Sequence, residues 1–391
     1  MKIQRIRKIH TKVIALICLL AVCIANFSTM QQNFLAEESF SVNAKSAVLM
    51  DYATGEILYD QNGDAKLQIA SMVKLMTIYL TTQSLEKNTL KLTDKLEASE
   101  NASGMGGSQV FIDANAVYTV EQMLKSVIMS SANDASVALA EKISGNEKSF
   151  VNLMNKTAKE IGMTNTLYAN CTGLPAPMQH STAKDTAILL SKLAENEIYK
   201  SYSSIWIDEL THPSGRKTEL VNTNKLVRYF KGCDCGKTGS TDEAGYCLSA
   251  SAERDGMRLI SVVMGTTSSK ERFAQSTVLL NYGFNNYENQ EIINKENSQA
   301  KATILKSLIT EVDVFAEQSF SAVVRKGEEK TFEIVIRLDE NLVAPLQAEQ
   351  KVGSIIISKN GKQIKEIALI LKSNIPALTL KDSIKKIIER F

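Results

Sequence analysis

The chain has 391 residues, of which 44% are hydrophobic, so it is long enough for two or three domains with ordinary buried cores. Its formal net charge is +2 at pH 7, but residues 1–30 contain five basic residues and no acidic one. The rest of the chain is therefore nearly neutral and slightly acidic. Because such a body lacks the basic stripe that nucleic-acid binding requires, we expect no nucleic acid among its partners.

The first segment has the composition of an export signal. Its basic residues precede an uncharged run of twelve apolar residues from Val13 to Ile24, which fits a signal peptide and is short for a membrane span. We therefore expect residues 1–30 to be a signal peptide and the protein to be exported. Two alternatives stay open. One is an uncleaved anchor, since no Ala-x-Ala site follows; the other is a lipoprotein signal at Cys23, although Val22 is bulkier than the residue usually found there.

The elements expected after the signal mix strands and helices. Strand patterns at both ends and helical patterns between them predict an α+β domain over residues 38–284, with helices packed against one antiparallel sheet. Two capping boxes, at 119–122 and 182–185, mark helix starts. Strands are expected over 47–52, 56–59, 236–239, 246–250 and 259–264, and helices over 71–88, 120–129, 134–143 and 183–195.

The last hundred residues have a different pattern. Residues 285–301 are polar without periodicity and are expected to be a linker. Residues 302–373 alternate strand patterns with Gly, Pro and Asn turns, which predicts a small all-β domain. Residues 376–391 predict an amphipathic basic helix, which either lies on a membrane surface or packs on the preceding domain. Its apolar face holds Ile384, Ile387, Ile388 and Phe391, and its basic residues are Lys381, Lys385, Lys386 and Arg390.

The first of three chemical motifs is Ser71-Met72-Val73-Lys74, at the predicted start of a helix. Residues three apart lie on the same helix face, so the amine of Lys74 can take the proton of the Ser71 hydroxyl. The helix start also offers backbone N–H groups that stabilise an oxyanion. The spacing is weak evidence by itself, since the chain repeats it at Ser84/Lys87, Ser298/Lys301 and Ser383/Lys386.

The other two motifs are Ser131-Ala132-Asn133, between two predicted helices, and Lys237-Thr238-Gly239, on a strand before a hairpin. A turn between helices projects Ser131 and Asn133 into a cleft, and Gly239 is expected to let a ligand backbone approach the strand. The order and structural contexts of the three motifs together are the signature of penicillin-binding proteins and class A β-lactamases.

Further segments extend this match over about residues 46–284. Together they resemble the low-molecular-mass D-alanyl-D-alanine carboxypeptidases, a family of penicillin-binding proteins. The all-β domain and the tail resemble that family's usual arrangement, which favours the membrane-surface alternative for the tail. The segments that carry the resemblance are Ala70–Thr77, Gly107–Phe111, Ser131–Ala135, Gly173–Pro175, His180–Ala183, Asn222–Leu226 and Lys237–Gly245.

The resemblance implies a penicillin-binding, transpeptidase-like fold and an acyl-enzyme mechanism. Ser71 would attack the carbonyl between the last two D-alanines of a peptidoglycan stem peptide, and neutral Lys74 would accept its proton. A lysine with a pKa near 10.4 is a poor base at pH 7, so we expect burial and the charge of Lys237 to lower the pKa of Lys74. Ser131 would relay a proton to the departing D-alanine. β-Lactams would acylate Ser71.

The remaining motif residues are implied to bind the substrate. Asn133 would hydrogen-bond its amide, and Lys237 and Thr238 would hold its terminal carboxylate beside Gly239. The backbone N–H groups of Ser71 and Ser240 would form the oxyanion hole. Neither a cofactor nor a metal is expected, and the enzyme is expected at the outer face of the cytoplasmic membrane.

Three other functions fit this sequence less well. A class A β-lactamase needs a Glu with an Asn four residues later to activate the deacylating water, and no such pair occurs between Ser131 and Lys237. A Ser-His-Asp hydrolase lacks its Gly-x-Ser-x-Gly motif here, and His180 is instead expected to structure the loop before the helix at residue 183. A non-catalytic wall scaffold is expected to have lost Ser71, Lys74 or Lys237, all of which are present.

Four cysteines and one arginine remain outside these motifs. Cys171, Cys233, Cys235 and Cys247 fit no zinc pattern, and they are either disulfide-bonded after export or buried thiols. Cys235 shares a strand face with Lys237, so it borders the expected cleft either as a redox switch or, as we favour, as an inert thiol. For Arg272 we favour a surface salt bridge over a role with the substrate carboxylate.

Overall fold

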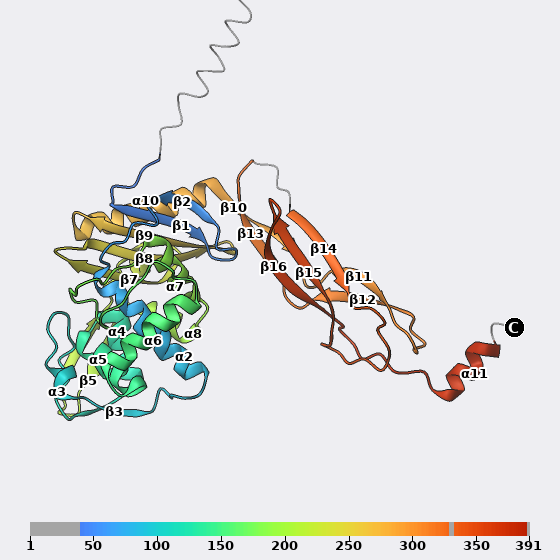
Figure 1. The fold of residues 1–391 in the computed structure, drawn as a ribbon, viewed down its shortest axis with the longest axis horizontal. Coiled ribbons are helices and arrows are strands. Elements are labelled where there is room, and N and C mark those ends of the chain that lie inside the picture. The colour runs from blue at the N-terminus through green and yellow to red at the C-terminus, as the bar shows by residue number, and fades with distance from the viewer. Residues whose placement is uncertain (1–39, 328–331, 389–391) are drawn as a thin grey trace, which may run out of the picture. The chain divides into compact units, whose positions relative to one another are not determined.

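The computed structural model describes residues 40–327 and 332–388 (Figure 1). The predicted signal peptide, with Cys23 and the possible cleavage sites, lies outside the described residues. Residues from Asn43 onward form the compact part of the chain. Its α+β region and its all-β region are described in turn.

The α+β region is built on a five-stranded antiparallel sheet with the strand order β2-β1-β9-β8-β7, so β7 is an edge strand. This confirms the predicted hairpin and the three later strands. All of β1 is buried, as are the middle residues of β8 and β9, because both faces of the sheet are covered. The strands are β1 (Ser46–Asp51), β2 (Ile57–Gln61), β7 (Cys233–Thr241), β8 (Gly245–Arg254) and β9 (Met257–Thr266).

Helices cover both faces of this sheet (Figure 1). Helix α10 (Ser269–Asn286), which the sequence patterns did not predict, packs on one face, and α7 (Ala183–Ala194) packs on the other. Gly283 lies where α10 crosses the sheet, and a Cβ there would be 2.4 Å from Leu259 Cδ1 and 2.8 Å from Leu49 Cδ2. The absent side chain therefore sets how closely α10 approaches β1 and β9.

A helical block connects β2 to β7, and the predicted helices are confirmed in it to within a few residues. Thr119 forms the predicted capping box with Gln122. The residues from Lys74 to Ile78 in α2 are all buried, so this helix runs through the interior of the block. The elements are η1 (Ala70–Val73), α2 (Lys74–Glu86), α3 (Glu100–Ser103), α4 (Val120–Ser130), α5 (Asn133–Ser144), α6 (Glu147–Glu160), α8 (Glu197–Ser203), α9 (Leu226–Tyr229), and the strand pairs β3 (Lys95–Glu97) with β4 (Val117–Thr119) and β5 (Ile207–Thr211) with β6 (Lys217–Val221).

The second region is all-β, as predicted, around its own apolar core. A five-stranded sheet has the order β11-β12-β16-β15-β14, and β10 pairs with β13. The segment 285–301 was predicted to be a linker, but it contains β10 and part of β11. The sequence pattern did not reveal β10, because most of its residues are polar and only Ile293 is buried. The strands are β10 (Tyr287–Ile293), β11 (Ser298–Thr303), β12 (Glu311–Ala316), β13 (Phe320–Arg325), β14 (Phe332–Leu338), β15 (Lys351–Lys359) and β16 (Lys362–Ile370).

The described chain ends in helix α11 (Leu380–Ile388), at the predicted amphipathic segment. Thr379 and Asp382 begin this helix, since the Thr379 hydroxyl accepts a hydrogen bond from the Asp382 N–H at 3.2 Å and donates to its carboxylate at 2.6 Å. Within residues 40–327 and 332–388, none of the helices combines the length and the apolar character needed to cross a bilayer.

The contact at Gly283 gives a stability prediction. Replacing Gly283 with Val forces an isopropyl group against Leu49 and Leu259, so we expect the free energy of unfolding to fall by about 1–3 kcal/mol. The matched control is Ala274→Val, at an exposed position of the same helix, where we expect a change within about 0.5 kcal/mol. Urea unfolding followed by circular dichroism measures both, and equal stabilities of the two variants would contradict the packing described here.

Candidate active site

Ser71 lies in the tight helical turn η1, directly before α2. Ala70, the residue before it, has a φ of 48°, in the left-handed region that costs a residue with a Cβ about 1 kcal/mol or more. The Lys74 amine reaches back to this turn, with its Nζ 3.0 Å from Ser71 Oγ. It also donates to the carbonyl of Thr172 at 2.5 Å. The predicted Ser71–Lys74 pair is thus in direct contact, and the Thr172 carbonyl orients the amine.

Lys74 is fully buried and makes no salt bridge among the described residues. Burial lowers the pKa of Lys74 to about 7, and the more distant Cys171 and Asp134 oppose the shift. Burial and Lys237 were both expected to lower this pKa; burial does so, whereas Lys237 is not among the causes of the shift. A pKa of about 7 makes the neutral form of the lysine, which can accept a proton, accessible at pH 7.

Lys237 is the second buried lysine, in the middle of edge strand β7. Its Nζ donates to the carbonyl of Thr238 at 3.3 Å, and no carboxylate of the described residues pairs with it. Burial lowers the pKa of Lys237 well below its ordinary value, and repulsion from Lys74 and Arg272 adds to the shift. A buried ammonium of this kind favours an anion from outside the chain as its partner.

Gly239 lies against the turn that carries Ser71. A Cβ at this position would be 2.5 Å from the carbonyl oxygen of Ile69 and 3.2 Å from the backbone nitrogen of Ser71. The space that a side chain would take is thus filled by the backbone of this turn. Gly239 lets strand β7 pack directly against η1, which brings the third motif to the first.

The second motif lies at the junction of α4 and α5. Ser131 ends α4 with a φ of 60°, and its buried Oγ has no hydrogen-bond partner among the described residues. The side-chain nitrogen of Asn133 donates to the carbonyl of Gly106 at 2.6 Å, while its buried Oδ1 likewise has no partner there. Because buried polar atoms are nearly always paired, both atoms are available to a ligand.

Sequence reasoning missed Asp134, whose buried carboxylate holds the loop that crosses in front of the second motif. It accepts hydrogen bonds from the backbone N–H groups of Val110 and Ile112, both at 3.1 Å. The same loop supplies the Gly106 carbonyl that orients Asn133. Asp134 lies within the segment Ser131–Ala135, which carries the family resemblance. Nothing in the spacing of the motif residues indicated that the partners of Asp134 lie more than twenty residues earlier in the chain.

His212 secures the other side of this loop. Its Nδ1 lies 2.9 Å from the Tyr118 hydroxyl and 3.1 Å from an Arg216 nitrogen, and Arg216 forms an ion pair with Asp113 at 3.2 Å. A guanidinium can only donate, so Nδ1 acts as an acceptor. Burial, followed by Arg216, lowers the pKa of His212, which favours the neutral ring. His180 occupies the predicted loop, where its backbone pairs with Leu167.

Arg272 does not form the surface salt bridge that we favoured. It lies on α10 and donates from Nη1 to the carbonyl of Gly239 at 3.1 Å. Burial lowers the pKa of its guanidinium, and no salt bridge of the described residues includes it. The side chain instead stacks on Tyr246 and Phe273. Arg272 thus supports strand β7 at the third motif.

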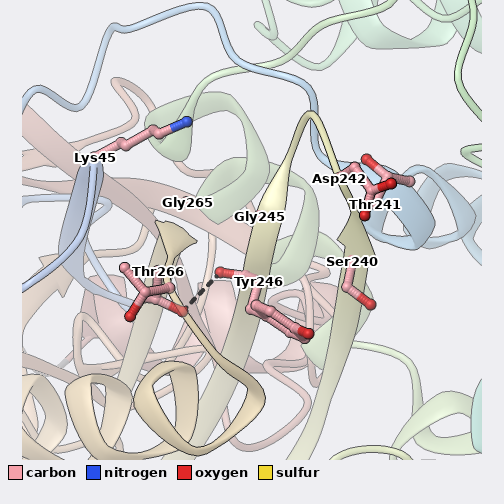
Figure 2. A pocket seen from close by; sticks show the side chains of 9 residues that line it. Lys45, Ser240, Thr241, Asp242, Gly245, Tyr246, Gly265 and Thr266 are labelled. Atoms are coloured by element: carbon pink, nitrogen blue, oxygen red, sulfur yellow. Dashed lines mark hydrogen bonds between the residues drawn. The ribbon is translucent and has the colours of Figure 1, made fainter.

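A cavity of about 500 Å³ lies at the ends of β7, β8 and β9 (Figure 2). Its lining includes Ser240, Asp242 and Tyr246, and the Thr266 hydroxyl donates to the Tyr246 carbonyl at 3.0 Å. Ser240 is the only predicted site residue among the lining residues. The cavity therefore lies beyond the third motif, at the end of the strand that carries Lys237.

The four cysteines of the described chain are all buried and free, so the disulfide alternative is wrong for this structure. Burial raises the pKa of Cys235 well above its ordinary value, so its thiol stays protonated and unreactive. This agrees with the inert thiol that we favoured over a redox switch. Residues 40–327 and 332–388 contain no cluster of three or more His, Cys, Asp or Glu side chains that could hold a metal ion.

The fold and the three motifs define a serine hydrolase of the penicillin-binding class. The family model described as D-alanyl-D-alanine carboxypeptidase matches residues 31–268, and the one described as penicillin-binding protein 5, C-terminal domain, matches residues 287–377. The chain therefore belongs to the D-alanyl-D-alanine carboxypeptidase family, as the sequence motifs predicted.

Curated relatives and solved structures agree with this assignment. The chain is 39% identical to the D-alanyl-D-alanine carboxypeptidase DacF of Bacillus subtilis, with 85% of each chain covered, and 36% identical to DacC of Escherichia coli, with 88% of this chain and 87% of that one covered. Penicillin-binding protein 5 of Haemophilus influenzae superposes with a TM-score of 0.68 at 33% identity, over 86% of this chain and 98% of that one. Penicillin-binding protein D2 of Listeria monocytogenes, solved with bound ampicillin, has a TM-score of 0.57 at 31% identity, over 63% of this chain and all of that one.

The pKa of Lys74 is directly measurable. We expect one lysine resonance to titrate near pH 7 when the Lys side-chain carbons are labelled with ¹³C, whereas exposed lysines titrate near 10.4. The Lys74→Arg variant identifies the resonance by its loss. The prediction is wrong if the resonance that the Lys74→Arg variant lacks still reports a protonated amine at pH 9.

Proposed function

We propose that the protein removes the terminal D-alanine from peptidoglycan stem peptides through an acyl-enzyme on Ser71. The observation that carries the proposal is the contact between Ser71 Oγ and the buried Lys74 amine at 3.0 Å. A lysine with a pKa of about 7 exists as a base at neutral pH, so it can take the proton as Ser71 attacks the peptide carbonyl. The activity is the one named for the family.

The substrate-binding roles follow from the unpaired groups around this contact. Lys237, with Thr238 beside it, is a buried cation without a carboxylate partner among the described residues, so it suits the terminal carboxylate of the peptide. The free Oδ1 of Asn133 suits an amide N–H of the substrate. Edge strand β7 offers its open side to an extended peptide, which would add as a further strand.

Two further roles complete the reaction. The backbone N–H groups of Ser71 and Ser240 would bind the oxyanion, which the close approach of Gly239 to the nitrogen of Ser71 supports. Ser131, with its unpartnered hydroxyl, would pass a proton to the amine of the departing D-alanine. Water then cleaves the ester and returns the free Ser71 hydroxyl.

β-Lactams are proposed as covalent inhibitors, because they present a reactive carbonyl and a carboxylate at the same spacing as the substrate. A relative was solved with ampicillin bound. The chain lacks the Glu-x-x-x-Asn pair between the second and third motifs that a class A β-lactamase uses for deacylation. We therefore expect the penicilloyl ester on Ser71 to be long-lived.

The protein is proposed to act outside the cytoplasm, at the outer face of the cytoplasmic membrane. Its family acts on peptidoglycan, and residues 1–30 have the composition of a signal peptide. Helix α11 would be the membrane contact, since Leu380, Ile384 and Ile388 are all exposed and the tail is rich in lysine.

The catalytic proposal is tested with the Ser71→Ala variant. We expect release of D-alanine from a D-Ala-D-Ala peptide to fall by about a thousandfold or more, because no other group can form the acyl-enzyme. Intact mass spectrometry should show one penicillin adduct on the unaltered protein and none on the variant. The matched control is Ser84→Ala, which removes the serine of a second Ser-x-x-Lys match and should leave both measurements unchanged.

A penicillin adduct that persists in the Ser71→Ala variant, or an unaltered protein that releases no D-alanine, would contradict the assignment. Rapid turnover of penicillin by the unaltered protein would instead favour the β-lactamase alternative.

The membrane proposal is tested by placing charges on the apolar face of the tail. We expect Ile384→Glu with Ile388→Glu to weaken sedimentation of residues 31–391 with phosphatidylglycerol vesicles by about tenfold or more, because two apolar side chains can no longer enter the lipid. Glu substitutions at Ile334 and Ile336, exposed on β14, serve as the charge-matched control. Equal binding of the two double variants would contradict a membrane role for α11.

A further inference from the structure

One end of the all-β region carries a group of exposed apolar side chains. Leu305, Leu308 and Ile309 belong to the turn between β11 and β12, and they are 45%, 57% and 44% exposed. Val343, which is 39% exposed, lies beside Leu305 through a parallel bridge. We call these four residues the apolar tip. Exposed apolar clusters on exported proteins mark surfaces that contact another molecule or a membrane.

Hydrogen bonds hold the turn that presents the tip in a defined conformation. The Ser307 side chain is buried, and its Oγ accepts a hydrogen bond from the N–H of Ile309 at 3.2 Å. The turn is closed by the N–H of Ile304, which donates to the carbonyl of Thr310 at 2.9 Å. Leu305 is held from both sides by backbone hydrogen bonds with residues 342 and 344. The backbone therefore fixes these apolar side chains in an outward orientation.

The C-terminal tail starts at this tip. The N–H of Leu378 donates to the carbonyl of Lys306 at 2.8 Å, and the Ser307 hydroxyl donates to the carbonyl of Pro376 at 3.1 Å. Helix α11 begins only two residues after Leu378, and its first residue, Leu380, is 80% exposed. The tail therefore leaves the β domain at the turn that carries the tip, two residues before helix α11 begins.

We propose that the apolar tip is a second membrane-contact element, which enters the same lipid surface as helix α11. The proposal rests on the proposed membrane association of the tail. Lys306, exposed at the centre of the turn, adds a positive charge suited to anionic headgroups. The four residues of the apolar tip are too few for a stable protein interface, which takes about 20 residues on each side.

This arrangement gives the β domain a defined end toward the bilayer. A helix attached by a flexible segment would let the domain point in any direction. With the tip and the start of the tail both in the lipid, the domain has contacts on two sides of the junction, and its orientation on the membrane is restricted.

The test uses the single tryptophan of the chain. In a Trp206→Phe background, Leu308→Trp places the only indole at the tip, and Ile334→Trp places it on β14 as the matched control. Ile334 pairs with Ile357, toward the β15–β16 hairpin, whereas the tail leaves from the opposite end of β16. Residues 31–391 are mixed with phosphatidylglycerol vesicles that carry brominated acyl chains, and binding is measured separately by sedimentation.

We expect the indole fluorescence of the Leu308→Trp protein to shift to shorter wavelength and to be quenched at least about twofold, because brominated chains quench an indole that enters the lipid. The fluorescence of the Ile334→Trp protein should change little. Vesicle binding with equal, weak quenching in both proteins would overturn the tip proposal and leave the tail proposal intact. Absence of binding in both proteins would overturn both proposals. A concentration-dependent shift of the Leu308→Trp emission to shorter wavelength in the absence of vesicles would point to contact with a second copy, and that too would overturn the proposal.

A second variant tests the proposed membrane contact of the tip independently. Leu308→Ser with Ile309→Ser should weaken vesicle binding by about fivefold to tenfold, because two apolar side chains no longer enter the lipid. D-alanine release from a soluble peptide and the circular-dichroism unfolding curve should both stay unchanged, which shows that the α+β region and the all-β region are folded. Unchanged vesicle binding by a fully active variant would count against the tip.

Discussion

The active site depends on one costly arrangement, a lysine amine buried beside a serine hydroxyl without any carboxylate of the described residues to neutralise it. Burial brings the pKa of Lys74 to about 7. A buried amine without an anion costs folding free energy, which the packing of the surrounding helical block must offset. The Thr172 carbonyl contributes one of the two hydrogen bonds that make this tolerable. Almost every other feature of the α+β region can be understood as support for this contact.

The support comes from three directions. Helix α2 carries Lys74 through the interior, so the lysine cannot be solvated without disturbing the core. Strand β7 brings the second buried cation, Lys237, next to the same turn, and Arg272 fastens that strand from α10. The loop that faces them is held by the Asp134 carboxylate. Burial lowers the pKa of Lys237 as well, and the neighbouring Lys74 adds to that shift.

Much of this could be predicted from the sequence, because the motifs are local. Ser71 and Lys74 lie one helical turn apart, and capping residues such as Thr119 fix helix starts within four positions. The predictions failed where distant segments decide the outcome. The partner of Lys74 is 98 residues away at Thr172, and the role of Gly239 depends on which backbone packs against it. Arginine is usually a surface residue, and only the position of α10 places Arg272 against strand β7.

The close approach at Gly239 links the position of β7 to the position of Ser71. Because the strand rests on the backbone around Ser71, we expect a displacement of β7 to shift that turn as well. We therefore expect substitutions along β7, even at the buried Cys235, to change the turnover rate as well as the affinity for the proposed peptide substrate.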